Sequence, residues 1–462
     1  MLKRKNLYFS GVLLAVCLSG CISTADTSPL TQPAGVKSSA TELIPKTWID
    51  KDTGHKIVRL SEEASSRSLY FHQNSYAASG DKMVISVDNP RGVAVVDLNT
   101  LDVKRIYEDP NVGILFMGPK SRDVYLTYIP SVNGQVVHPQ NELQTPTKVL
   151  AVNIDTGVMR EVATVPKGKI HSINNDETLL IGAFAEKAHS LETGPRDKRF
   201  EARYEAKDAD GNPLSFADAK EVRMDERLEA RIPMQMFTVD LKTGEQKTIM
   251  KSTDWLNHIQ FSPNDPELVM YSHEGPWHKV DRIWVTDIHG KTPQKIHQRM
   301  MNMEIAGHEF FGFDGKHIFY DLQTPRGQDF WLASYNLETG ERVWRHMERD
   351  EWSVHFNISR DGKWFAGDGG DHEMVAKAKD GKWIYLFESI PVKDVAGIHA
   401  RNAKDLIKPA VLKSHKLVNM QNHDYRLEPN ITFTPDGKWL VFRSNMHGPV
   451  HVYAVELAKT VN

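Results

Sequence analysis

Histidine or asparagine opens six strand-like segments along this chain, and these residues form the pattern best suited to chemistry. In the last four segments, an Asp or Asn follows the opening residue six positions later, at a turn. Imidazole exchanges a proton near physiological pH and also ligates metal ions. A polar residue that recurs at one position of a repeated unit indicates a ring of side chains. The six segments are Asn74–Asp81, His171–Glu177, His258–Asp265, His308–Gly315, His355–Gly362 and Asn430–Gly437.

The segments that carry these residues share one repeated pattern, in which strands of alternating polar and apolar residues are joined by tight turns. A strand leads into a turn such as Thr434–Gly437, and a strand such as Lys438–Phe442 follows it. Asp-Gly and Thr-Gly between alternating strands are strong hairpin signals, because Gly supplies the positive φ that such turns need. With an apolar copy around Phe116–Asp123, seven strand-turn-strand units can be counted. The sequence therefore predicts an all-β fold, a seven-bladed β-propeller, with six or eight blades as alternatives.

The two ends of the repeat region predict how the propeller closes. The last unit, which ends near Leu457, lacks its own Thr-Gly hairpin, whereas Asp52-Thr53-Gly54 forms an unpaired hairpin at the other end. An open sheet edge is a liability that closure removes. We therefore expect the N-terminal strand within Trp48–Ser61 to complete the last blade of a single domain that spans residues 46–460.

The N-terminal residues are typical of an exported lipoprotein. Residues 1–20 contain a basic start and a short apolar stretch, as in a signal peptide, and Leu18-Ser19-Gly20-Cys21 resembles a bacterial lipoprotein cleavage box. Cys21 would then carry the lipid anchor, and residues 21–45 would form a flexible tether. Since Ile22 is not the Asp that favours inner-membrane retention, we expect an outer-membrane lipoprotein on the periplasmic or cell-surface side. An ordinary signal peptide is the alternative.

Charge and cysteine content exclude several classes of function. The formal net charge is −3, which gives no reason to expect nucleic acid as a partner. The chain has 2 cysteines, one in the signal peptide and the other at the lipid position, so we expect no disulfide and no cysteine nucleophile. A charged insertion around residues 186–232 interrupts the repeats. It is either a solvated surface segment or a lid whose arginines reach an anionic ligand.

Particular motifs in the second half of the chain resemble the oligogalacturonate lyases. They are the stretch Asn257–Trp284 with its His-Glu-Gly-Pro sequence, the Gly307–Phe310 unit, Gly367–Gly369, and Phe433–Asp436. The resemblance implies a seven-bladed propeller enzyme that cleaves short pectin fragments by β-elimination. It also implies a divalent metal, typically manganese, with calcium as an alternative.

The resemblance also implies roles for individual residues. His308 matches the catalytic base, Arg282 matches the arginine that assists it, and His355 matches a metal-binding histidine. Near the last blade the family has a Gln and a His-Pro-His sequence, whereas this chain has Tyr425 and then Glu428-Pro429-Asn430. Glutamate and asparagine oxygens also ligate hard divalent ions. The expected metal ligands are His355, Glu428, Asn430 and His423.

The chemistry of uronate cleavage fits these residue types. Removing the C5 proton, which is α to a carboxylate, requires a base near neutral pKa and positive charge on that carboxylate. Histidine suits the first role, and the rigid fork of arginine suits the second. Glycoside hydrolysis would need a pair of carboxyl groups, which the motifs do not offer. Residues expected to contact substrate, with a structural role as the alternative, are His258, His273, His171 and Trp277.

The sequence leaves two other functions open and disfavours a third. The first is a lyase for another uronate glycan, such as rhamnogalacturonan, ulvan or alginate fragments. The second is a non-catalytic periplasmic binding protein of TolB-like architecture, which would not need a base, an arginine and metal ligands together. The third, the propeller half of a serine oligopeptidase, is disfavoured because the sequence contains no Gly-x-Ser-x-Gly elbow.

Overall fold

The computed structural model describes residues 44–459, except 129–130, 133–134, 137–145, 188–206, 213, 215, 372–377, 395–396 and 398. One compact unit spans Pro45–Asn462. The expected signal peptide, Cys21 and nearly all of the expected tether lie outside the described residues. Within the described ranges, no helix combines the length and apolar character needed to cross a membrane.

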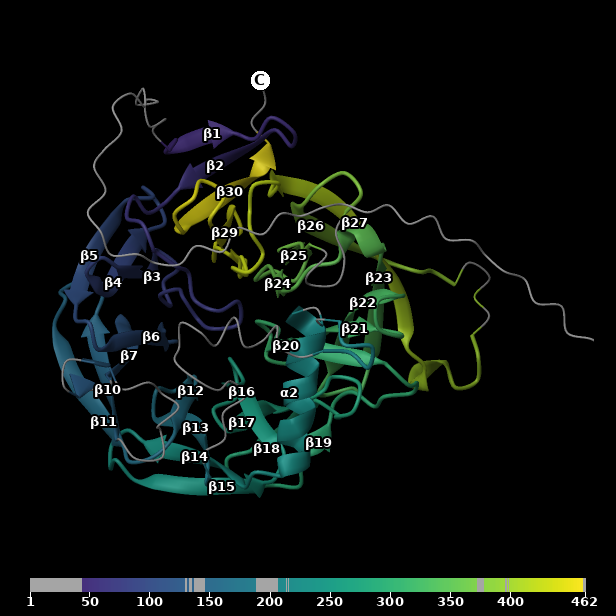
Figure 1. Ribbon diagram of the computed structural model, residues 1–462, viewed down its shortest axis with the longest axis horizontal. Coiled ribbons are helices and arrows are strands. Elements are labelled where there is room, and N and C mark those ends of the chain that lie inside the picture. The colour runs from purple at the N-terminus through teal and green to yellow at the C-terminus, as the bar shows by residue number, and fades with distance from the viewer. Residues whose placement is uncertain are drawn as a thin grey trace, which may run out of the picture. The chain divides into compact units, whose positions relative to one another are not determined.

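Seven blades surround a central channel, which confirms the predicted β-propeller (Figure 1). In the described part of the chain, five sheets supply one blade each and an eight-stranded sheet supplies two. The first three blades are built from the following strands. They are β3 (Lys82–Asp88), β4 (Arg91–Asp97) and β5 (Val103–Glu108); β6 (Val112–Met117), β7 (Asp123–Tyr128), β10 (Thr147–Asn153) and β11 (Met159–Val165); and β12 (Lys169–Ile173), β13 (Leu179–Ala185), β14 (Met234–Asp240) and β15 (Gln246–Ser252).

The next three blades hold most of the predicted site residues. Blades five and six share the eight-stranded sheet, because β23 pairs with β27 in parallel. Their strands are β16 (Trp255–Phe261), β17 (Leu268–Glu274), β18 (Ile283–Asp287) and β19 (Gln294–Lys295); β20 (Ile305–Phe311), β21 (His317–Gln323), β22 (Phe330–Asn336) and β23 (Arg342–Met347); and β24 (Phe356–Ile358), β25 (Trp364–Gly367), β26 (Trp383–Pro391) and β27 (Lys408–Asn419). Smaller elements are the β8–β9 hairpin (Ser131–Val132, Gln135–Val136) and the 3-10 turns η2 (Arg349–Glu351) and η3 (Ala403–Asp405).

The N-terminal strands complete the seventh blade, as the sequence predicted. Its strands are β28 (Thr432–Phe433), β29 (Trp439–Ser444), β30 (His451–Lys459), β2 (His55–Arg59) and β1 (Thr47–Ile49). The pairing of β2 with β30 places Ile57 opposite Val455, and Ile57 is only 1% exposed. This pairing removes the outer edge that β30 would otherwise present.

The turns between the first two strands of a blade are fixed by local side-chain hydrogen bonds. In the last blade, the Thr434 hydroxyl donates to Asp436 Oδ1 over 2.7 Å, and Asp436 Oδ1 accepts the Lys438 backbone N–H. Gly437 then takes a φ of +67°, a conformation that costs glycine little. Because this chemistry is local, the sequence could predict the repeat before any long-range contact was known.

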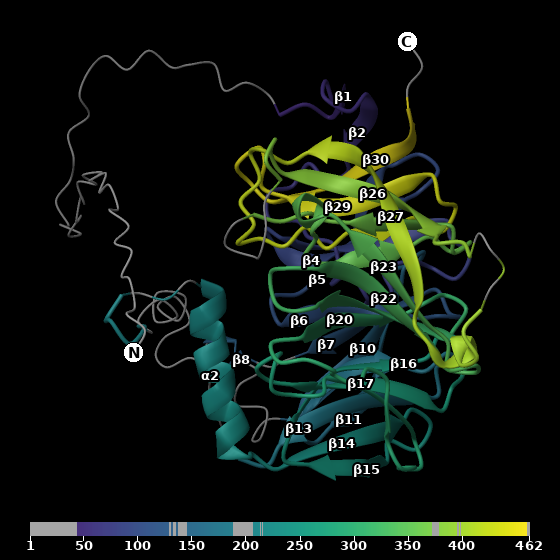
Figure 2. The same ribbon diagram turned by 90° about the vertical axis from the view of Figure 1, so that its right-hand side faces the viewer.

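The charged insertion contains one helix in its described part, α2 (Phe216–Ala230). Figure 2 shows α2 alongside one face of the ring of blades. Arg326, in the loop after β21, forms ion pairs with Asp218 (2.9 Å) and Glu221 (3.0 Å) of the helix. Lys279, in the loop between β17 and β18, pairs with Asp225 over 2.7 Å. Blades four and five therefore hold α2 at two points.

Candidate active site

Three of the predicted ring residues have an uncommon backbone conformation. His258 and His308 have φ values of +46°, and Asn430 has a φ of +51°. The register of the inner strand shifts between Asn257 and Gln260 in one blade, and between Gly307 and Phe310 in the next. A left-handed residue at a bulge turns its side chain away from the regular alternation. Strain of this kind tends to be kept at functional sites.

His308 is backed by a buried carboxylate on the neighbouring strand. Its Nδ1 lies 3.0 Å from Oδ1 of Asp321, a residue of β21 whose side chain is 3% exposed. A carboxylate oxygen accepts hydrogen bonds, so this contact favours a proton on Nδ1 of His308. The His308 side chain remains 26% exposed, and its ring centre lies 4.8 Å from that of His355. The imidazole is therefore fixed at one nitrogen and accessible.

His355 is fully buried and has acidic groups on both sides. Its Nδ1 lies 2.9 Å from Asp368 Oδ2, while its Nε2 lies 3.3 Å from the Tyr70 hydroxyl and 3.9 Å from Glu428 Oε2. Burial disfavours the charged imidazole, but Asp368 and Glu428 outweigh burial and raise the pKa of His355. Burial likewise opposes the charge of Glu428, yet His355 and His308 hold the pKa of that carboxyl below its usual value.

A segment between β2 and β3 brings Tyr70 and Phe71 into the centre of the ring. The Phe71 N–H donates to Asn430 Oδ1 over 3.0 Å, and the Asn357 amide donates to the Phe71 carbonyl over 3.3 Å. The Phe71 ring packs 4.7 Å from the ring of His355. Burial raises the pKa of Tyr70 well above its ordinary value, and Glu428 adds to this effect. The phenol is therefore protonated at neutral pH.

Arg282 is buried beside Glu309, the residue that follows His308 in the sequence. Arg282 Nε donates to Glu309 Oε2 over 2.8 Å, and both side chains are almost fully buried. Arg282 Nη1 is also buried and has no hydrogen-bond partner among the residues that the structure describes. One edge of the guanidinium is thus fixed by Glu309, which leaves Nη1 to bind another acceptor.

His258 lies near a second buried carboxylate, that of Glu274 at the end of β17. The His258 Nε2 is 3.8 Å from Glu274 Oε1, and the Asn257 amide donates to the other oxygen. Although burial opposes the charge of Glu274, His258 and Arg282 lower the pKa of this carboxyl. The ring centre of His258 lies 6.0 Å from that of Tyr70, which connects it to the His355 group.

The structure brings together two of the four expected metal ligands, His355 and Glu428. Within the described ranges, no group of three or more His, Cys, Asp or Glu side chains is placed to hold a metal ion. The Asn430 amide is used in the scaffold, since its Nδ2 donates to the Glu428 carbonyl over 3.1 Å and its Oδ1 binds Phe71. His423 is buried, with Nδ1 2.9 Å from the Ser444 hydroxyl and Nε2 2.7 Å from the Leu427 carbonyl. Both of its ring nitrogens are thereby engaged away from His355.

The other residues expected to contact substrate lie in three different places. The ring of His273 packs 5.1 Å from Trp284, and its Nδ1 lies 3.6 Å from Asp254 Oδ2. Trp277 lies beneath α2, with the Lys220 amine 5.3 Å from its ring centre. His171 lines a cavity in the channel, where burial lowers its pKa well below the ordinary value.

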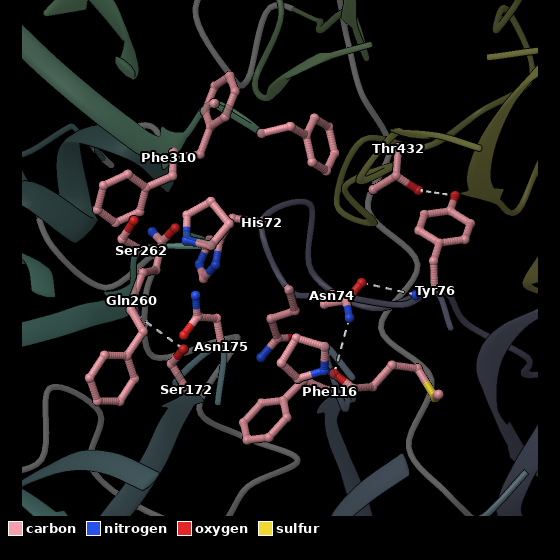
Figure 3. Close-up of a pocket in the computed structure, with 18 of the residues that line it drawn as sticks. His72, Asn74, Tyr76, Phe116, Ser172, Asn175, Gln260, Ser262, Phe310 and Thr432 are labelled. Atoms are coloured by element: carbon pink, nitrogen blue, oxygen red, sulfur yellow. Dashed lines mark hydrogen bonds between the residues drawn. The ribbon is translucent and has the colours of Figure 1, made fainter. Parts of the chain in front are cut away.

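That cavity has a volume of about 340 Å³, and Figure 3 shows side chains that line it. Its lining includes residues that follow His258, His308, His355 and Asn430 along their strands, such as Gln260, Phe310, Asn357 and Thr432. Phe71 and His72 also line it, whereas His308, His355 and Arg282 do not. The segment 71–74 therefore lies at the border between the cavity and the His308 group.

Sequence reasoning missed Tyr70, Asp321 and Glu274 as members of this group. Tyr70 lies in a segment without strand periodicity, so no pattern marked it. Asp321 could have been found from spacing, since it follows His308 by 13 residues, as Asp368 follows His355. The group as a whole combines two carboxylate-backed histidines, a buried arginine and a phenol at one end of the channel.

The fold and this group together define a β-propeller protein with a buried polar site at the axis of its ring. A family model for oligogalacturonate lyase matches residues 203–461. The chain belongs to the oligogalacturonate lyase family.

Known relatives cover nearly the whole of this chain. The oligogalacturonate lyase of Dickeya dadantii strain 3937 is 25% identical over 426 residues, which are 90% of this chain and 96% of the relative. The oligogalacturonide lyase of Pectobacterium atrosepticum is 24% identical over 429 residues, with the same coverage of 90% and 96%. A solved structure described as an oligogalacturonate lyase in complex with manganese superposes with a TM-score of 0.64 at 23% identity, covering 89% of this chain and 96% of the other.

Proposed function

We propose that this protein is a lyase that cleaves short oligogalacturonates by β-elimination and leaves a 4,5-unsaturated uronate at the new end. Membership in the oligogalacturonate lyase family supports this activity. The observation that carries the proposal is an accessible imidazole, His308, that lies against His355 of the buried His355–Asp368 pair and directly precedes Glu309, the partner of the buried Arg282. Base and cation are the two groups that uronate elimination needs.

In the proposed reaction, one residue of the group transfers the proton and another stabilises the negative charge that develops. His308 Nε2 takes the C5 proton, and the electron pair of that bond forms the C4–C5 double bond as the C4–O bond breaks. The leaving oxygen keeps the C4–O electron pair and gains a proton from water. The buried positive charge of Arg282 stabilises the negative charge that accumulates on the substrate carboxylate as C5 loses its proton.

His355 and Glu428 are the residues that would hold a divalent ion. An imidazole nitrogen and a carboxylate oxygen that are 3.9 Å apart fit the ligand types that manganese accepts. A related structure is described as a complex with manganese, so we propose manganese for this chain as well. When bound, the ion supplies positive charge beside the substrate carboxylate.

The activity is tested with the purified mature chain, digalacturonate or trigalacturonate, and manganese. We expect ultraviolet absorbance from the unsaturated product in the wild type and its loss in His308→Asn. Asparagine tolerates the left-handed φ of position 308, so the variant should fold. The matched control is His317→Asn, which changes a half-buried histidine at the start of β21 in the same blade. Absence of product from every acidic oligosaccharide, or full activity in His308→Asn, would refute the assignment.

We also propose that Cys21 carries a lipid that anchors the protein to the outer membrane. The proposal rests on the sequence from Leu18 to Cys21 and on the tether-like composition that follows. Cells that express the full chain should incorporate labelled palmitate into the protein and retain it in the outer-membrane fraction. Cys21→Ala should lose both properties, and unchanged labelling of this variant would exclude the anchor.

A further inference from the structure

Asp321 is the buried acidic residue behind the accessible histidine of the site. Its Oδ1 lies 3.0 Å from His308 Nδ1, and its side chain is 3% exposed. The adjacent strand β20 leaves room for this contact at Gly307, which lies opposite Asp321 in the strand pairing. A Cβ at position 307 would lie only 3.3 Å from Asp321 Oδ1. The inner strand is therefore built so that the carboxylate can reach the ring.

The propeller repeat supplies an internal comparison for this position. Asp321 is the fifth residue of β21, and Ser272 is the fifth residue of β17 in the blade before it. The Ser272 hydroxyl donates to the backbone carbonyl of Asn257 over 3.1 Å. The equivalent position on the neighbouring strand is therefore a serine in the blade of His258 and an aspartate in the blade of His308. Both histidines nevertheless have the same left-handed φ of +46°.

This difference separates the two histidines chemically. His258 approaches a carboxylate with Nε2, which is 3.8 Å from Glu274 Oε1. His308 binds its carboxylate with Nδ1, so that Nε2 is the nitrogen with a lone pair. A base must present an unprotonated nitrogen to the substrate, and His308 does so in a fixed orientation.

We propose that Asp321 is a positioning residue that holds His308 in the Nδ1–H tautomer and thereby makes it the base of the site. The role of His308 as the base rests on the proposed β-elimination, whereas the assignment of its Nδ1–H tautomer does not. When Nε2 takes the C5 proton, the imidazolium forms opposite the Asp321 carboxylate. The imidazolium then returns its Nε2 proton to water, and Asp321 gains no proton in the cycle.

The experiment compares the wild type with Asp321→Asn in the mature chain. The ring ¹⁵N chemical shifts of His308, assigned with His308→Asn, report which nitrogen carries the proton. Kinetics on trigalacturonate report kcat and KM separately. We expect Nδ1–H in the wild type and a mixed or Nε2–H form in the variant. We also expect kcat to fall about 100-fold or more while KM changes less than about 3-fold, as is typical when a histidine base loses its orienting carboxylate.

Asp314→Asn is the matched control, because it removes a carboxylate from a histidine in the same blade. Asp314 Oδ2 lies 2.5 Å from His317 Nδ1 at the exposed turn, and we expect wild-type kcat. A wild-type tautomer with Nε2–H, or an Asp321→Asn variant that keeps kcat within about 3-fold, would overturn the proposal. If the wild type proves inactive on uronates, the proposed function fails. The wild-type tautomer alone then decides the role of Asp321.

Discussion

Individual residues of the site differ most in the partner that holds them. His308, His355 and His423 are all on or near the channel side of blades five to seven, but each has a distinct second contact. His308 contacts Asp321 through Nδ1, His355 faces Glu428, and His423 has both nitrogens engaged by Ser444 and Leu427. The residue type alone does not reveal which histidine can act on a ligand.

Glu428 should contribute to metal affinity together with His355. The change Glu428→Gln keeps the size of the side chain but removes the negative charge that lies 3.9 Å from His355 Nε2. We expect manganese affinity of the metal-free protein to fall at least about 10-fold, as loss of a metal-site group commonly does. Isothermal titration calorimetry without substrate measures this directly. Glu338→Gln, at an exposed turn of blade five, is the control, and equal affinities of the two variants would contradict the assignment.

His423 should make stability depend on pH. Burial, the dominant influence, lowers the pKa of His423 to about 4. The unfolded chain, with a histidine pKa of about 6.5, then binds more protons than the folded chain, so stability falls as pH drops from about 6.5 towards 4. In His423→Gln this loss is absent. We expect the stability difference between wild type and variant to change by about 2 kcal/mol between pH 7 and pH 5 in urea unfolding, with the wild type losing more. An unchanged difference would mean that His423 titrates normally.

Among the elements, α2 is the one whose function the fold least explains, since it belongs to no blade. Its inner side is apolar, and Ala219 and Met224 are both fully buried. Lys220, one residue along from Ala219, lies over Trp277, and its charge lowers the pKa of Glu274 and of Glu428. The helix thus carries a cation towards the Glu274 and Glu428 carboxylates.

Lys220 should therefore assist the binding of an acidic oligosaccharide. For Lys220→Met we expect KM for trigalacturonate to rise about 5- to 10-fold, which corresponds to roughly 1 kcal/mol for one partly screened charge pair, with little change in kcat. Steady-state kinetics at low and high salt measure the effect, which should shrink as salt screens the wild-type interaction. Lys242→Met, at an exposed turn of the third blade, serves as the control. If both variants have the same KM, α2 is only a surface segment.

At the scale of the whole molecule, closure of the seventh blade joins the two ends of the propeller. β2 pairs with β30, and Ile57 of β2 packs in a cluster that also contains Phe442 and Tyr453. The site residues come from four blades and from the segment after β2, so their positions depend on a closed ring. Loss of the N-terminal pairing should therefore affect both stability and the site.

Ile57→Asp should test this closure. A carboxylate at a position that is 1% exposed would be buried without a partner, and we expect the free energy of unfolding to fall by more than about 3 kcal/mol. Ile49→Asp in β1 is the control, because Ile49 is 39% exposed and should cost less than about 1 kcal/mol. Urea unfolding followed by tryptophan fluorescence compares the two. Equal losses would show that the β2–β30 pairing adds little to the stability of the ring.

The sequence alone determined the repeat and the strand that closes the ring, and it predicted seven blades with six or eight as alternatives. These features depend on local signals, such as the Asp436-Gly437 turn and the alternation of strand residues, which act within one hairpin. His308 and His355 were also identified from the sequence by their repeated positions, although His308 lies in the middle of β20 rather than at its start, and His355 lies one residue before β24. Family motifs around His273–Pro276 and Gly307–Phe310 added the predicted chemistry.

Only the tertiary structure decided which groups stand beside those histidines. Asp321 reaches His308 because the bulge after Gly307 sets the strand register, and Tyr70 reaches His355 because a segment between blades enters the ring. The separation of His423 from the site, and the use of the Asn430 amide to hold Phe71, were equally hidden from the sequence. Local turns depend on neighbouring residues, whereas these contacts join residues that are distant along the chain or depend on a one-residue shift in pairing. A sequence pattern specifies the first kind of interaction, and only the closed ring specifies the second.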